Sequence, residues 1–218
     1  MILKYGRRIL QILFGVSLLG LGSYLNVKAN IGLAAWDAFS MGLSAVTGVE
    51  FSTMVILVSA SIFLVVLLMR QPVGLGTILN TFLYGAFIRM WQRLIPLPTL
   101  DSFWPGVGLV LLAQASIAAG TAVYISGGMG CGPRDSLMTG LHQRLPRVPI
   151  GAIRTSIELA ALAAGFLMGA RVGAGTVIAA VSIGVFIQIA FRVSGLSRRE
   201  IRHEDLPETA RKLFGAEK

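Results

Sequence analysis

The feature that most constrains the fold is a series of six apolar segments that carry few charges. Each has about 20 residues, the length at which an α-helix crosses the hydrocarbon core of a bilayer. Charged residues make up 13% of the chain, about half of the roughly 25% typical of soluble domains. The sequence therefore predicts an all-α membrane protein with about six transmembrane helices. The predicted spans are 9–27, 52–69, 73–92, 104–125, 150–168 and 173–192.

Two further apolar segments, 33–46 and 133–145, are too short and too polar to span a bilayer. Each follows a turn that contains glycine and carries an aspartate near its start, Asp37 in the first segment and Asp135 in the second. Such segments form helices that either enter the membrane without crossing it or lie at its surface. We expect two short helices here, and both the re-entrant and the interfacial arrangement fit the pattern.

The basic residues of the loops predict how the chain is oriented, because cytoplasmic loops of membrane proteins are enriched in Lys and Arg. If the N-terminus lies inside, eight basic residues fall on the cytoplasmic side before the C-terminal tail is counted. Four fall outside: Lys28, Arg89, Arg93 and Arg171. We therefore expect both termini in the cytoplasm. The net charge of +9 is explained by loops that face anionic lipids, and no nucleic-acid motif accompanies it.

An internal repeat is visible along the chain. Residues 30–37 (Asn-Ile-Gly-Leu-Ala-Ala-Trp-Asp) match residues 128–135 (Gly-Met-Gly-Cys-Gly-Pro-Arg-Asp). Further along each half, the Gly-x-Gly-Thr pattern of residues 74–77 recurs at residues 173–176. Matches in the same order and at nearly the same spacing indicate that the chain contains two copies of one structural unit.

The repeat divides the chain into a first membrane repeat over 1–98, a second over 99–194, and a charged cytoplasmic tail over 195–218. Each repeat holds three spans and one short helix. Because three is an odd number, the second repeat enters the membrane in the opposite orientation. This is the inverted-topology arrangement of many transporters. The alternative is a duplication that serves packing alone.

Arg154 and Glu158 are the most conspicuous charges inside a predicted span. They lie four residues apart and so share one helix face, where they can pair. Ionisable groups within a bilayer are costly and usually face a bundle interior or a water-filled cavity. One interpretation is a substrate-binding arginine held by Glu158, or a Glu158 that carries a coupling proton. The other is an internal ion pair that fixes the position of the helix.

The segment Gly130-Cys131-Gly132-Pro133-Arg134-Asp135-Ser136 predicts the start of the second short helix. Pro133 suits the first helical turn, and Asp135 can cap free N–H groups there, as Asp37 can in the first repeat. Together with Arg134, the exposed N–H groups form a candidate anion site. The alternative is that Asp135 only caps the helix and Arg134 contacts lipid headgroups.

Three polar residues follow from the Gly-x-Gly-Thr pattern: Thr77, Thr176 and, one turn after Thr77, Asn80. A phosphate-binding loop is a weak interpretation of so short a glycine pattern. Small residues at the start of a membrane helix also allow close packing, and threonine can bond to a neighbouring helix. Packing is the favoured interpretation, with direct ligand contact as the alternative.

Enzyme chemistry finds little support in the sequence. His142 and His203, the two histidines, fall in loop or tail positions, and the one cysteine, Cys131, lacks an evident histidine partner. No arrangement of residues suggests a catalytic triad or a metal site. We therefore expect no enzymatic activity, no cofactor and no bound metal.

These motifs resemble those of the YczE/YitT-type bacterial integral membrane proteins. The resemblance rests on Gly130-x-Gly132-Pro133-Arg134-Asp135-Ser136-Leu137-Met138, on Arg154-x-x-x-Glu158, and on the two Gly-x-Gly-Thr segments. It covers nearly the whole chain except the tail. It implies a multi-span protein of the bacterial inner membrane and does not specify a substrate.

The predicted function is that of a small secondary transporter or permease for a small organic solute, with an anionic solute favoured. The candidate substrate-binding residues are Arg134, Arg154, Glu158, Asp135, Asp37, Thr77, Asn80 and Thr176. The first alternative is a ligand-binding membrane subunit of a larger transporter. The second is a regulatory or scaffold protein for a membrane-associated enzyme complex. The expected partners are membrane lipids, an unidentified solute and, as an open option, further copies of the chain.

Overall fold

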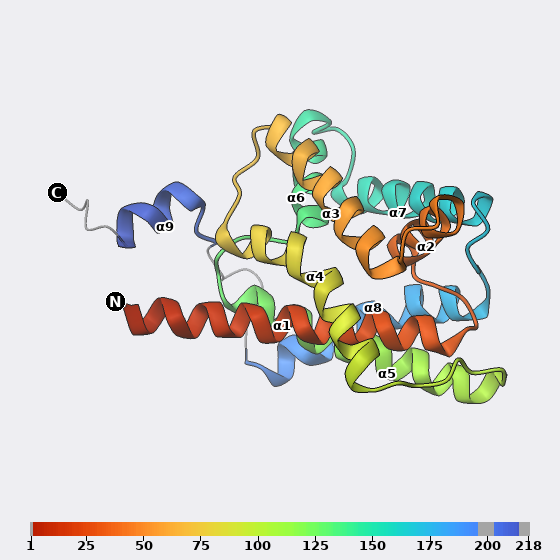
Figure 1. Cartoon of the computed structure of the whole chain (residues 1–218). Coiled ribbons are helices and arrows are strands. Elements are labelled where there is room, and N and C mark those ends of the chain that lie inside the picture. The colour runs from red at the N-terminus through yellow and green to blue at the C-terminus, as the bar shows by residue number, and fades with distance from the viewer. Residues whose placement is uncertain (1, 196–202, 214–218) are drawn as a thin grey trace.

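A computed structural model describes residues 2–195 and 203–213, and this part of the chain contains nine α-helices and no strands (Figure 1). The all-α prediction is therefore confirmed. The predicted tail over 195–218 lies partly outside the described residues. The helices are α1 (Ile2–Ala29), α2 (Ala35–Thr47), α3 (Phe51–Leu68), α4 (Leu75–Leu94), α5 (Phe103–Ser126), α6 (Pro133–Arg144), α7 (Ile150–Leu167), α8 (Ala174–Val193) and α9 (Leu206–Leu213).

Five helices are long and apolar enough to cross a membrane: Tyr5–Ala29 within α1, together with α3, α5, α7 and α8. Each coincides with a predicted span to within a few residues, except that α1 begins earlier. The remaining predicted span corresponds to α4, which has 20 residues but carries Asn80, Arg89 and Arg93 and is less apolar. A sixth crossing by α4 therefore stays a prediction.

The two short helices form where the sequence predicts them. α2 has 13 residues and α6 has 12. Both follow backbone turns with positive φ angles, at Gly32 (φ 130°) before α2 and at Gly130 (φ 111°) before α6. A side chain would be strained there, and it would also meet neighbouring atoms, since a Cβ atom on Gly32 would lie 2.7 Å from the backbone nitrogen of Gly173.

α1 and α5 form the central contact of the bundle, and Figure 1 shows them running side by side in opposite directions. Small residues allow the two backbones to approach closely. A Cβ atom on Gly15 would lie 2.8 Å from the carbonyl oxygen of Gly120, and a Cβ atom on Gly120 would lie 2.7 Å from that of Gly15. α4 packs on α1, and α8 packs on α5.

The short helices pack across the two halves of the chain. α2 contacts α7, and α6 contacts α3 and α4. The segment before α9 reaches the beginning of α1, where Glu204 forms an ion pair with Arg8 at 2.8 Å. The first helix therefore begins at the same end of the bundle at which the described C-terminal segment docks (Figure 1).

Candidate functional site

The start of α4 is bonded to the loop that precedes α6. The backbone N–H of Gly76 donates to the carbonyl of Met129 at 2.7 Å, and the hydroxyl of Thr77 donates to the carbonyl of Cys131 at 2.6 Å. Thr77 is fully buried. These bonds satisfy backbone groups of a loop that lies inside the bundle, where unpaired groups are costly.

The start of α8 makes the corresponding bonds to the loop that precedes α2. The backbone N–H of Gly175 donates to the carbonyl of Ile31 at 2.8 Å, and the hydroxyl of Thr176 donates to the carbonyl of Leu33, also at 2.8 Å. Each Gly-x-Gly-Thr segment thus holds the turn that precedes the short helix of the other half. Both threonine hydroxyls bond to backbone carbonyls. This agrees with the interpretation that the motif serves packing.

A buried acid, Asp37, lies in the first turn of α2. Its side chain is 3% exposed. It faces Ser23 and Asn26 of α1, Tyr84 of α4 and the guanidinium group of Arg134. Four helices, three from the first half of the chain and one from the second, therefore meet around this carboxyl group.

Arg134 lies in the first turn of α6, and two aromatic rings hold its guanidinium group. The central carbon of the guanidinium lies 5.0 Å from the ring centre of Trp36 and 5.6 Å from that of Tyr84. Contacts of this kind stabilise a cation over the face of a ring. Tyr84 and Arg134 both face Asp37, so the contact with Tyr84 also holds Arg134 close to the buried acid.

We call Ser23, Asn26, Trp36, Asp37, Tyr84 and Arg134 the central cluster. Buried polar atoms in proteins almost always have a hydrogen-bond partner. The central cluster departs from this rule, because six of its buried polar atoms make no hydrogen bond of 3.5 Å or shorter within the described residues, although Ser23, Asn26 and Tyr84 face the Asp37 carboxyl group. Arg134 and Asp37 attract each other but form no ion pair there. The unpartnered atoms are Ser23 Oγ, Asn26 Oδ1 and Nδ2, Trp36 Nε1, Asp37 Oδ1 and Arg134 Nη2.

Asp135 and Asn80 both reach the loop that precedes α6. A Cβ atom on Gly132 would be 3.8 Å from Asp135 Oδ2 and 4.0 Å from Asn80 Oδ1. The structure thus places Thr77, Asn80 and Asp135 at this loop, whereas Asp37 and Arg134 belong to the central cluster. Both aspartates lie in the first turn of their helices, as predicted, and their capping role stays a prediction.

Arg154 and Glu158 form the predicted ion pair, with 2.9 Å between Nε and Oε1. Their side chains are 46% and 38% exposed, and α7 is the least buried of the five candidate spans. In the described chain the pair therefore lies on an outward-facing part of the bundle, and no interaction links it to the central cluster. Thr176 also lies apart from the central cluster, because its hydroxyl bonds to the loop that precedes α2.

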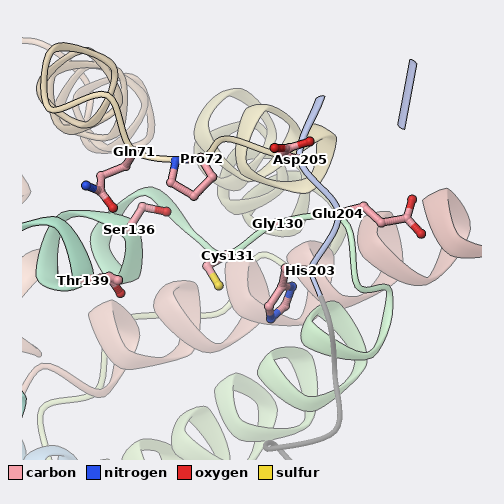
Figure 2. Close-up of a pocket in the computed structure, with 10 residues that line it drawn as sticks. Gln71, Pro72, Gly130, Cys131, Ser136, Thr139, His203, Glu204 and Asp205 are labelled. Carbon is pink, nitrogen blue, oxygen red and sulfur yellow. The ribbon is translucent and has the colours of Figure 1, made fainter. Parts of the chain in front are cut away.

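A pocket of about 110 Å³ opens beside Cys131 at the loop before α6. We call it the tail pocket, because the segment 203–205 forms one of its walls. Figure 2 shows Cys131 between α6 and His203. The residues that line it are Gln71, Pro72, Gly74, Gly130, Cys131, Ser136, Thr139, His203, Glu204 and Asp205.

Glu204 fixes the C-terminal segment to the bundle. Its carboxylate accepts bonds from Arg8, Tyr5 and Lys212, and its backbone N–H donates to the carbonyl of Gly128 at 2.8 Å. Burial acts to raise the pKa of Glu204, but the bonds from Arg8, Lys212 and Tyr5 outweigh it and lower the pKa. For His203, whose charged form is the protonated one, burial has the opposite effect and lowers the pKa. The docked segment therefore favours a neutral imidazole.

No motif in the sequence points to Ser23, Asn26 and Tyr84 as site residues, and Trp36 stands out only as part of the repeat. Ser23 and Asn26 give a weak signal, since they are three residues apart in an otherwise apolar segment and so share a helix face. The pairing of Arg8 with Glu204 gives none, because residues so far apart in the chain form no local pattern.

Comparison with known proteins places the chain in a family. Residues 6–192 match the model of a family of unknown function (DUF6198). An uncharacterized protein of Haemophilus influenzae is 32% identical over 182 residues, which cover 84% of this chain and 82% of that protein. No solved structure matches the chain.

A second relative identifies the kind of protein. The uncharacterized membrane protein YczE of Bacillus subtilis is 30% identical over 178 residues, covering 81% of each protein. The family model's match over residues 6–192 includes both short helices and the central cluster. The chain therefore belongs to the YczE-type family and is a multi-pass membrane protein.

Proposed function

We propose that the two halves of the chain are inverted repeats with six crossings in total. The reciprocal bonds support this, because Thr77 and Thr176 occupy matching positions and hold matching loops. The docking of Glu204 on Arg8 gives a second argument. A chain whose two ends lie on the same side must cross the membrane an even number of times, so α4 joins the five apolar helices as a crossing.

Both ends of the chain lie in the cytoplasm in this proposal, and the membrane is the bacterial inner membrane. The excess of basic residues in the loops of that side supports the orientation. The outward faces of α7 and α8 are rich in exposed apolar side chains, including Phe166, Val177 and Val181. Membrane lipids cover these faces.

The function that the geometry supports best is that of a small secondary transporter. The observation that carries it is the set of unpartnered buried polar atoms in the central cluster, at the junction of the two halves. Substrate sites of inverted-repeat transporters lie at such a junction, next to the ends of short helices. The solute is a small organic molecule with an anionic group, which Arg134 binds. Asp37 and Asn80 provide further polar contacts.

Purified protein in detergent, screened for thermal stabilisation by a pool of small bacterial metabolites, tests this function. A solute that binds the folded state raises the unfolding temperature. We expect at least one compound to do so, and we expect uptake of that compound into liposomes that contain the protein.

Two arginine variants make the screen specific to the site. Arg134→Gln should abolish the stabilisation, whereas Arg154→Gln should preserve it, because the Arg154 side chain lies on the outward face of α7. A screen in which folded protein responds to no compound contradicts the transporter function. Stabilisation that persists in Arg134→Gln and disappears in Arg154→Gln would move the site to α7.

The docked C-terminal segment favours one alternative, a regulatory or scaffold protein. In that case a partner protein would compete for Arg8 or for Glu204, and the chain truncated after Gly195 would lose its effect on the partner. A transporter truncated at the same point keeps its uptake activity. Uptake by the truncated protein therefore distinguishes the two functions.

A further inference from the structure

We propose that the solute is a small zwitterion of the α-amino-acid type, whose carboxylate binds Arg134 and whose ammonium group binds Asp37. This inference rests on the proposed function and names the class of its substrate. It follows from the fact that Arg134 Nη2 and Asp37 Oδ1 are both buried without a hydrogen-bond partner, while the two groups lie close enough to attract each other.

Arg134 is prepared to bind a carboxylate. Its guanidinium group is held between the rings of Trp36 and Tyr84, while Nη2 is buried and has no partner. A planar guanidinium held in a fixed orientation matches the two oxygens of a carboxylate. Arg134 also lies in the first turn of α6, where the helix dipole favours a negative charge.

Asp37 is prepared to bind an ammonium group. Its side chain is 3% exposed, and Oδ1 has no hydrogen-bond partner. The nearby Asn26 adds a second unpartnered acceptor, Oδ1, and Ser23 adds a hydroxyl. A lone carboxylate inside a bilayer is costly, whereas a carboxylate that meets a cationic ligand group is neutralised in place.

The spacing and the charge balance of the cluster select among solutes. Arg134 lies close enough to Asp37 to attract it, so the two ligand charges must be close together, as they are in an α-amino acid. Arg134 and Asp37 balance each other's charge in the empty cluster. A simple anion on Arg134 would be repelled by Asp37, and a simple cation on Asp37 would be repelled by Arg134, whereas a zwitterion keeps the balance. A neutral polar solute would satisfy neither charge.

Binding to the full-length protein in detergent tests the inference. The twenty L-amino acids are tested singly by thermal shift and calorimetry, and each one that binds is compared with its deaminated and its decarboxylated analogue. We expect at least one amino acid to bind and both analogues to bind at least about tenfold more weakly, because each leaves one charge of the site unpaired.

Two variants assign the ends of the ligand. Arg134→Gln should weaken binding of the amino acid at least about tenfold. Asp37→Asn should also weaken it, and it should reduce the preference for the amino acid over its deaminated analogue. Glu158→Gln, which removes a carboxylate on the outward face of α7, serves as the matched control and should bind as the unaltered protein does.

The outcomes separate this inference from the proposed function. If no amino acid binds but a plain carboxylate binds and requires Arg134, the zwitterion is wrong and the transporter site stands. If amino acids bind equally well to the Arg134 and Asp37 variants, the assigned site is wrong. If neither amino acids nor the metabolite pool stabilises folded protein, both proposals are wrong.

Discussion

Asp37 shows at the scale of single residues what sequence reasoning could and could not establish. The internal repeat pointed to Asp37 and Arg134 because both stand at the start of a short helix, and to Thr77 because its motif recurs. No local pattern could show that Ser23, Asn26 and Tyr84 face Asp37. A single polar residue in an apolar helix does not reveal which neighbour it meets.

The pair Arg154 and Glu158 illustrates the opposite case. Spacing along a helix correctly predicted that the two side chains pair. It could not predict that the pair faces outward, because the direction of a helix face depends on which helices pack against it. α7 packs against α2 and α6, and this leaves its Arg154 face exposed.

A first prediction concerns the two threonines that hold the loops. Thr77→Val and Thr176→Val each remove a hydroxyl that donates to a buried carbonyl while keeping the shape of the side chain. We expect each to destabilise the protein by about 1–3 kcal/mol, because the carbonyl is left unsatisfied. Thermal unfolding in detergent measures the effect.

Thr121→Val is the matched control, because the Thr121 hydroxyl bonds to the Ile117 carbonyl within its own helix. Such a bond supports no contact between segments, and its loss should cost less. If all three substitutions had equally small effects, the bonds of Thr77 and Thr176 to the loops of the opposite half would not hold the two halves together.

At the scale of elements, the sequence located the helices well and the connections poorly. The length of the apolar segments predicted the spans, and a glycine-containing turn followed by an aspartate predicted α2 and α6. The docking of the C-terminal segment was unpredictable, since it depends on Glu204 meeting Arg8 and on the Leu206 N–H meeting the Val73 carbonyl across the fold. Local sequence carries no record of such pairings.

A second prediction uses Cys131, the one cysteine of the chain, which lies in the tail pocket beside His203. Glu204→Gln removes the negative charge that Arg8 and Lys212 bind, so the C-terminal segment should dock less tightly. We expect a thiol reagent to label Cys131 several times faster in this variant. Arg211→Gln is the control, since Arg211 donates to Pro207 within the same segment. An unchanged labelling rate would contradict the docking role of Glu204.

A third prediction concerns pH. The pKa of docked Glu204 lies below its ordinary value of 4.5, so docking is stabilised above about pH 4.5 and weakens as the pH falls through the docked pKa. His203 acts in the same direction: its docked pKa lies below 6.5, so the undocked segment binds a proton first as the pH falls. We expect the ratio of labelling rates, Glu204→Gln over unaltered protein, to fall towards one as the pH drops from about 4.5 through the docked pKa. A ratio that grows with acidity would contradict this sign.

At the scale of the whole molecule, the repeat predicted more than the composition did. Composition indicated a membrane protein, whereas the repeat indicated which segments correspond. It could not indicate that each Gly-x-Gly-Thr segment bonds to the loop of the opposite half. These reciprocal bonds form only when both halves are folded together. They place the central cluster at the junction of the two halves.

A fourth prediction tests the inverted arrangement. In a Cys131→Ser background, single cysteines replace Thr99, between α4 and α5, and Val148, between α6 and α7. A reagent that cannot cross the membrane, added to intact cells, should label the cysteine at 99 and not the one at 148, because α5 crosses the membrane between them. Labelling of both, or of 148 alone, would contradict the proposed topology.

The central claim is that the cluster around Asp37 and Arg134 binds a solute and is not a structural ion pair. The most direct test is the unfolding temperature of Asp37→Asn in the absence of solute. A ligand site carries an unsatisfied buried charge when it is empty, so we expect an unchanged or raised unfolding temperature. A structural pair loses about 3–5 kcal/mol when one partner is removed, so a fall of roughly 6 °C or more would contradict the claim.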